Sequence, residues 1–137
     1  MKKFFSTRVS ETNLSIGLFI LRIGAGFLML ANHGYGKLAG FAEKSQNFKI
    51  NFLGIGTTAS FSLVVFAEFF CAAFIILGLF TRLAVIPLII AMSVALFVAN
   101  KGKIVGPGEL AGIFLACYIV LFFTGPGKLS VDRFLFR

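Results

Sequence analysis

The sequence has few charged residues, and this scarcity excludes a soluble fold. Only 13% of its 137 residues are charged, against about 25% in soluble domains. Hydrophobic residues make up 58%, and the mean hydropathy is +0.98. A soluble domain of this length cannot bury so much apolar surface. The composition therefore predicts a single membrane-embedded domain over residues 1–137.

Residues that bind metals and cofactors are also scarce. The chain has one histidine, His33, five acidic residues and two cysteines, Cys71 and Cys117. Both cysteines lie inside apolar runs and form no CxxC pair, so we expect them to be packing residues. A metal site needs several converging ligands, so none is predicted. Since no nucleotide loop or catalytic triad is present either, the sequence encodes no cofactor site.

Tryptophan is absent, so the aromatic anchors common at membrane interfaces can only be Tyr35 and Tyr118. The net charge of +8 comes from basic residues placed singly or in pairs at the ends of apolar stretches. This placement is typical of membrane flanks and does not favour nucleic-acid binding. The lipid bilayer is the partner that the composition predicts.

Four apolar stretches are present, at about 14–34, 58–80, 83–99 and 109–124. Each is close to the length needed to cross a bilayer, and lipid offers no partners to an unpaired backbone, so each must be a helix. The sequence thus predicts an all-α integral membrane protein, a four-transmembrane-helix bundle. The polar segment after the first stretch is consistent with a short interfacial helix between the first two spans. Arg22 and the lack of an A-x-A site argue against a cleaved signal peptide.

Two charges fall inside the predicted spans. Arg22 lies in the first and Glu68 near the middle of the second. Each costs about 2.5–3.5 kcal/mol at a helix centre, so each should face the bundle and find a partner. The estimated depths allow an Arg22–Glu68 ion pair between adjacent antiparallel helices. Such a pair either joins the helices or belongs to a proton-active or ligand-binding site, and the sequence leaves both open.

A stripe of one helix face leads from Arg22 toward the only histidine. Arg22, Gly26, Met29 and His33 follow at helical spacing. Lys37 extends the stripe only if the helix continues through Gly-Tyr-Gly, which we do not expect. Glu109 opens the fourth span on the same side of the membrane, so this end would gather His33, Lys37 and Glu109. For His33 the alternatives are an interfacial imidazole and a functional one.

The segments that carry these residues resemble the DoxX family. "LRIGAGFLMLANHGYGKLAGF" is similar to a signature with an arginine followed by His-Gly-x-x-Lys-Leu, and "AEFFCAAFIILGLFTRLAVIPL" resembles a second block. "GELAGIFLACYIVLFFTGPGKLSVDRFL" is similar to the last block. Besides Arg22, His33, Lys37, Glu68 and Glu109, the matching positions include Gly34, Arg82, Gly125, Pro126, Gly127, Ser130 and Asp132.

The resemblance implies a multi-pass protein of the cell membrane, the inner membrane in a bacterium. Some DoxX relatives are membrane subunits of quinone-linked oxidoreductases, which implies a subunit without a redox cofactor of its own and a quinone as the bound molecule. Others act as membrane chaperones, so a non-catalytic scaffold or assembly factor is the alternative, and whether the protein is an enzyme stays open. Expected partners are other membrane or redox subunits, or further copies in a homo-oligomer.

The side of the membrane follows from the basic residues. Lys2, Lys3, Arg8, Arg82, Lys128, Arg133 and Arg137 fall on the side of both termini, and Lys37, Lys44, Lys49, Lys101 and Lys103 on the other. This small excess predicts that both termini are cytoplasmic.

Overall fold

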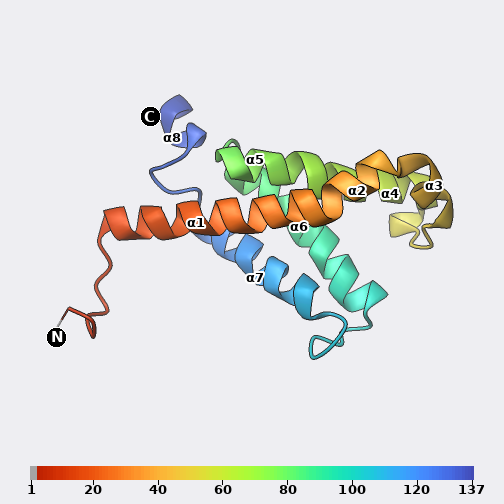
Figure 1. The fold of residues 1–137 in the computed structure, drawn as a ribbon, viewed down its shortest axis with the longest axis horizontal. Helices are drawn as coiled ribbons and strands as arrows, with labels where there is room; N and C mark the ends of the chain where they lie inside the picture. The colour runs from red at the N-terminus through yellow and green to blue at the C-terminus, as the bar shows by residue number, and fades with distance from the viewer. Residues whose placement is uncertain (1–2) are drawn as a thin grey trace.

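The computed structural model describes residues 3–137, and every regular element in that range is helical. Three helices are long and apolar enough to cross a membrane, Glu11–Ala39, Thr57–Leu77 and Thr81–Ala99, and Glu109–Thr124 is a shorter apolar helix. They pack into an elongated bundle (Figure 1). The predicted all-α membrane bundle is thus confirmed.

The three long helices each contain a turn of π-helix, and the shorter fourth helix does not. The first consists of α1 (Glu11–Met29), the π-helical η1 (Leu30–Gly34) and α2 (Tyr35–Ala39). The second consists of α4 (Thr57–Val65), the π-helical η3 (Phe66–Cys71) and α5 (Ala72–Leu77). The third consists of α6 (Thr81–Val94) and the π-helical η4 (Ala95–Ala99), and the fourth is α7 (Glu109–Thr124).

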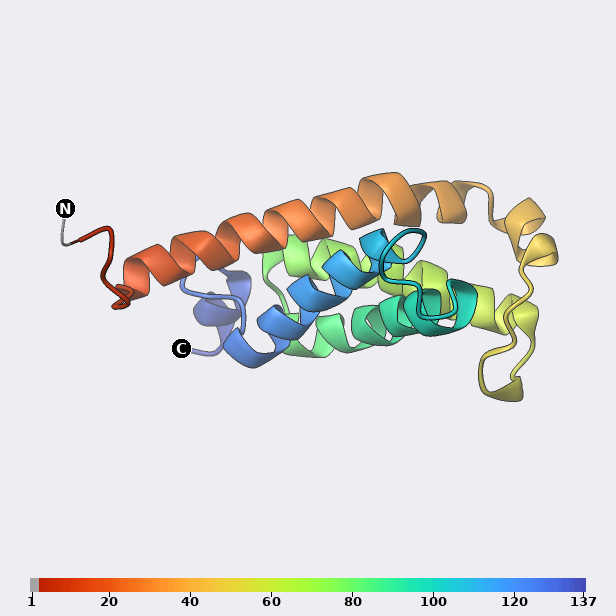
Figure 2. The ribbon, with the colours of Figure 1, turned by 90° about the horizontal axis from the view of Figure 1, so that it is seen from below.

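Both termini lie at one end of the bundle, which we call the terminal end (Figures 1 and 2). The opposite end, the loop end, carries the connections 40–56 and 100–108. The first connection contains the helix α3 (Phe41–Asn47) and a 3-10 turn, η2 (Phe52–Gly54). A short helix therefore does follow the first span, as the sequence predicted. A last helix, α8 (Val131–Leu135), lies in the C-terminal tail at the terminal end.

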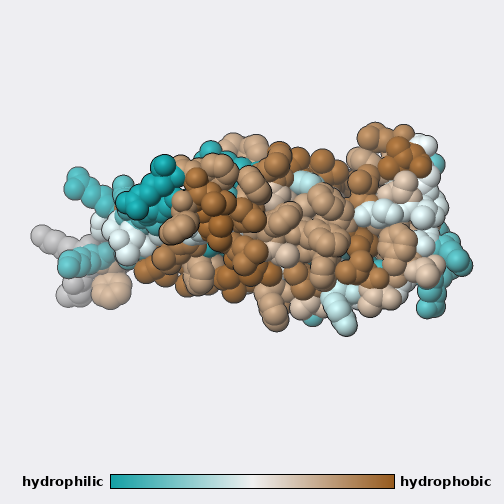
Figure 3. Space-filling view, turned by 90° about the horizontal axis from the view of Figure 1, so that it is seen from above, coloured by the Kyte–Doolittle hydropathy of each residue, from teal (hydrophilic) through white to brown (hydrophobic). Residues whose placement is uncertain are grey.

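Apolar side chains cover the middle of the molecule, and polar ones gather toward its ends (Figure 3). The exposed apolar residues include Ile20, which is 64% exposed, and Phe27, which is 58% exposed. This belt is the expected surface of a protein whose sides face lipid. Tyr118, by contrast, is fully buried and belongs to the core. The prediction of Tyr118 as an interfacial anchor is therefore wrong, whereas Tyr35 is exposed.

The first helix does not end at Gly34. It continues through Gly-Tyr-Gly as far as Ala39. Glycine disfavours a helix by about 1 kcal/mol, but here the wider π turn carries the chain through, with the Tyr35 N–H donating to the Leu30 carbonyl five residues earlier. The expected break is thus wrong, and Lys37 remains part of the first helix.

Candidate functional site

The buried carboxylate of Glu68 forms an ion pair with Lys37. The Glu68 side chain is 5% exposed and the Lys37 side chain 29%, so the pair joins the bundle interior to its surface. The predicted ion pair between Arg22 and Glu68 is wrong. A buried carboxylate needs a charged or hydrogen-bonding partner, and Lys37 becomes that partner because the first helix continues past Gly-Tyr-Gly.

Gly34 brings the two helices together at this pair. It is buried in η1, which packs on η3, the π-helical turn that carries Glu68. A methyl group at position 34 would overlap the Glu68 carbonyl oxygen and lie 2.8 Å from the Phe69 Cα atom. Only glycine permits so close an approach of two backbones. Lys37, three residues beyond Gly34, therefore lies on the helix face that meets Glu68.

Arg22 is fully buried and is bound by backbone carbonyls instead of a carboxylate. Its Nη1 donates to the Ile75 carbonyl at 3.1 Å and to the Ile76 carbonyl at 3.3 Å, and its Nη2 donates to the carbonyl of Leu129 in the tail. Ile75 and Ile76 lie in the last turn of α5, where the helix dipole is negative and carbonyls can accept hydrogen bonds from outside the helix. Arg22 thus joins the first helix, the end of the second and the tail.

The axial distance explains why Arg22 does not reach Glu68. The carbonyls that Arg22 binds are seven and eight residues further along the second helix than Glu68. At a rise of 1.5 Å per residue this is roughly 10–12 Å, more than an arginine side chain can span between facing helices. The depths estimated by counting from the span ends did not place the two helices correctly relative to each other.

Asp132 attaches the tail to the turn between α5 and α6. Its carboxylate accepts hydrogen bonds from the backbone N–H groups of Phe80 and Thr81, the latter at 2.9 Å, and its own N–H donates to the Gly78 carbonyl at 2.8 Å. The carboxylate thereby caps the N-terminus of α6 from a distance of fifty residues in sequence. A side chain at Gly78, which has a φ of +69°, would overlap the Arg22 guanidinium.

The DoxX family model matches residues 17–101 of this chain, more than half of its length. The chain belongs to the DoxX family. No curated protein and no solved structure matches it. In this DoxX protein the matched range contains Arg22, His33, Lys37 and Glu68, whereas the predicted last signature block lies beyond it.

His33 lies beside the fourth helix of this DoxX protein. Its partly buried ring makes an edge-to-face contact with Phe114, with the centroids 5.9 Å apart, and Phe114 stacks on Tyr118 at 6.0 Å. The buried hydroxyl of Tyr118 donates to the Ala25 carbonyl at 3.4 Å. Because the π turn inserts one extra residue, Gly34 takes the inward position that a regular helix would give His33.

Within residues 3–137, no hydrogen bond or ion pair joins any two of His33, Lys37 and Glu109, which the sequence predicted to lie together. Lys37 pairs with Glu68, and His33 meets α7 at Phe114, in its second turn. Glu109 is exposed at the first residue of α7 and forms no ion pair within residues 3–137.

The remaining signature positions surround the start of the tail. Arg82 donates to the Phe123 carbonyl at 3.2 Å, next to Gly125, where α7 ends. Gly127 packs against Leu18 of α1. A methyl group placed at Gly127 would lie 3.4 Å from the nearest Leu18 atoms. The Ser130 hydroxyl donates to the Gly127 carbonyl at 2.8 Å, and Pro126 lines the adjoining cleft. These residues dock the tail, and none of them contacts the Lys37–Glu68 pair.

The sequence reasoning missed two contacts that fix the tail to α1. Lys128 forms an ion pair with Glu11, and its backbone N–H donates to the Ser15 hydroxyl at 3.2 Å. Both partners lie more than a hundred residues away in sequence, and no local pattern signals such a contact. The acidic first turn of α1 was the only available indication.

Proposed function

We propose that this DoxX-family protein is a membrane subunit of a quinone-linked redox assembly and carries no redox centre of its own. The observation that carries the proposal is the buried Lys37–Glu68 pair, which is linked to the surface through the partly exposed lysine. Ionisable residues at membrane depth are costly, and they commonly mark proton or substrate paths. The pair therefore favours a proton-active role over simple joining of the helices.

The residues around the pair suit a quinone headgroup. A quinone ring needs hydrogen-bond donors at its carbonyls and a flat apolar wall. Lys37 and His33, one helical turn apart, supply donors, and Phe114, which meets the His33 ring edge-to-face, supplies an aromatic side chain. Reduction of a quinone to a quinol takes up two electrons and two protons. Two protons taken up from water would reach the quinone through Lys37 and Glu68, which each gain and release a proton in turn, and a partner subunit would deliver the two electrons.

Gentle purification followed by identification of the bound molecules and proteins tests this proposal. We expect a quinone in lipid extracts of the purified protein, at lower occupancy in Glu68→Gln and Lys37→Met, together with a redox subunit. A matched control is Glu43→Gln, which removes an exposed carboxylate at the loop end. His33→Asn should abolish quinone-dependent activity and leave folding intact. Wild-type activity in that variant would make His33 an interfacial side chain only.

The alternative is a scaffold that holds another membrane protein, and one observation favours it. Gly17 and Gly24 lie seven residues apart on the first helix, and a methyl group at either would meet nothing within 4 Å. Small residues at this spacing permit close approach of a partner helix. A stoichiometric partner without a redox centre, recovered without quinone, would support the scaffold and contradict the redox proposal. A second copy of the chain on this face would indicate a homo-oligomer.

For location, we propose the inner membrane with both termini in the cytoplasm. The terminal end holds both termini and the turn between α5 and α6, which Arg82 follows directly (Figure 1). The larger number of basic residues at this end supports the orientation. Labelling of single cysteines introduced at Lys101 and Lys128, with a reagent that does not cross membranes, distinguishes the two orientations. The Lys101→Cys variant should be labelled in whole cells, and the Lys128→Cys variant only after lysis.

A further inference from the structure

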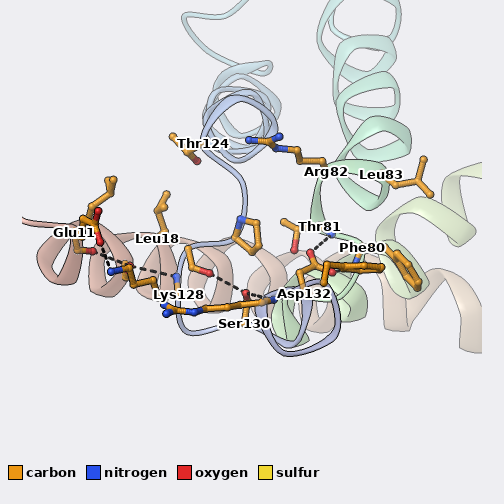
Figure 4. Close-up of a pocket in the computed structure, with 16 residues that line it drawn as sticks. Glu11, Leu18, Phe80, Thr81, Arg82, Leu83, Thr124, Lys128, Ser130 and Asp132 are labelled. Atoms are coloured by element: carbon orange, nitrogen blue, oxygen red, sulfur yellow. Dashed lines mark hydrogen bonds and ion pairs between the residues drawn. The ribbon is translucent and has the colours of Figure 1, made fainter.

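A cleft of about 660 Å³ opens at the terminal end, away from the Lys37–Glu68 pair (Figure 4). Its walls are the first turns of α1, the turn between α5 and α6, the end of α7 and the docked tail. The volume is within the range of small-molecule sites. Because the cleft lies where all four apolar helices begin or end, it lies at the level of the lipid headgroups.

Thr81 contributes an unsatisfied polar group to this cleft. The residue is fully buried, and within residues 3–137 its hydroxyl has no hydrogen-bond partner. Figure 4 shows the side chain among the residues that line the cleft, near Asp132. Leaving a buried hydroxyl unpaired costs about 1–3 kcal/mol, so a polar partner from outside the chain is expected here.

The charges that line the cleft favour an anion. Two acidic residues are present, but Glu11 is paired with Lys128, and the Asp132 carboxylate accepts two backbone N–H groups. Arg133 lines this cleft and, with Arg137, a neighbouring one of about 420 Å³. Both arginines are exposed, and neither guanidinium has a hydrogen bond or ion pair within residues 3–137. Two cations are therefore available for a ligand.

Apolar side chains next to these arginines favour a lipid over a soluble anion. Phe136 is 67% exposed and lines the larger cleft together with Arg133. Phe134 is 88% exposed and lines the smaller cleft together with Arg133 and Arg137. Arginines alternating with exposed aromatic residues are typical of a segment that lies in the membrane interface. Basic pockets between transmembrane helices bind anionic lipid headgroups.

We propose that the terminal end binds the headgroup of one anionic phospholipid. Arg133 and Arg137 contact the phosphate, the Thr81 hydroxyl bonds to the glycerol region, and Phe134 and Phe136 lie among the upper acyl carbons. The proposal does not depend on quinone binding, because the residues involved are distinct from Lys37 and Glu68.

The test is a lipid titration of the purified full-length protein in detergent, with binding followed by native mass spectrometry. The probes are phosphatidylglycerol and phosphatidylcholine. We expect phosphatidylglycerol to bind more tightly than phosphatidylcholine. Each arginine removed in R133Q/R137Q should lower the affinity for phosphatidylglycerol about fivefold. The matched control is K101Q/K103Q, which removes two exposed lysines at the loop end. The single variant Thr81→Val should also weaken binding of phosphatidylglycerol, although it leaves the net charge unchanged.

Three results would overturn the proposal. Equal affinity for the two lipids would exclude recognition of the negative headgroup. Equal losses in R133Q/R137Q and K101Q/K103Q would show a response to net charge alone. Full competition by glycerol phosphate would identify a site for a soluble phosphate compound and exclude a lipid site.

Discussion

Replacing Gly34 with alanine tests the close contact between the first two helices. The added methyl group would lie 2.6 Å from the carbonyl carbon of Glu68 and 2.8 Å from the Phe69 Cα atom, whereas ordinary contacts begin near 3.4 Å. These are backbone atoms and cannot rotate away, and the Glu68 carbonyl oxygen would be closer still, so the helices must separate locally by about 1 Å. Overpacking of this kind costs about 1–3 kcal/mol, partly offset by about 1 kcal/mol of helix propensity. We expect a net loss of up to about 2 kcal/mol.

The matched control for this substitution is Gly24→Ala. Gly24 lies in the same helix, and a methyl group there would meet nothing within 4 Å. We therefore expect no loss, or a small gain from helix propensity. Both variants would be unfolded in the same detergent, with helicity followed by circular dichroism. If Gly34→Ala is as stable as Gly24→Ala, the first two helices do not approach each other closely at Glu68, and Lys37 is not held beside Glu68.

Two further substitutions test the docking of the tail. Asp132→Asn removes the charge that caps α6 at Thr81, and it should lower stability in the same assay by about 1 kcal/mol; unchanged stability would exclude this cap. Gly78→Ala should cost at least about 1 kcal/mol more than Gly102→Ala. The φ angles of the two glycines are +69° and +71°, but only at Gly78 would a methyl group overlap Arg22, whereas the nearest atom at Gly102 is 3.9 Å away. Equal losses would mean that Arg22 does not bind beside Gly78.

The helices and the buried charges could be predicted from the sequence, because both follow from the cost of polar groups in lipid. Long apolar runs must be helical, and Arg22 and Glu68 are indeed buried. The pairing could not be predicted. It depends on the π turn at Leu30–Gly34, through which the first helix continues past Gly-Tyr-Gly, so that Lys37 stays on the helix that packs against Glu68. Helical periodicity of 3.6 residues does not reveal such a turn.

The tail illustrates a second limit of the sequence. The end of the last span at Gly125 was predictable from the Gly-Pro-Gly that follows it. The return of the chain was not, because the contacts of Asp132 with Thr81 and of Lys128 with Glu11 join positions fifty or more residues apart. Of the charged residues in these contacts, the resemblance to DoxX drew attention to only one. It marked Asp132 but did not reveal the cap that Asp132 forms.

The partner of Glu68 is the central claim, and a pair of double-mutant cycles tests it most directly. One cycle combines Lys37→Met with Glu68→Gln, and the other combines Arg22→Gln with Glu68→Gln, each measured as the free energy of unfolding in detergent. We predict a coupling of about 0.5–3 kcal/mol in the first cycle, and additivity within about 0.5 kcal/mol in the second. Coupling of Glu68 to Arg22 with additivity at Lys37 would contradict the account.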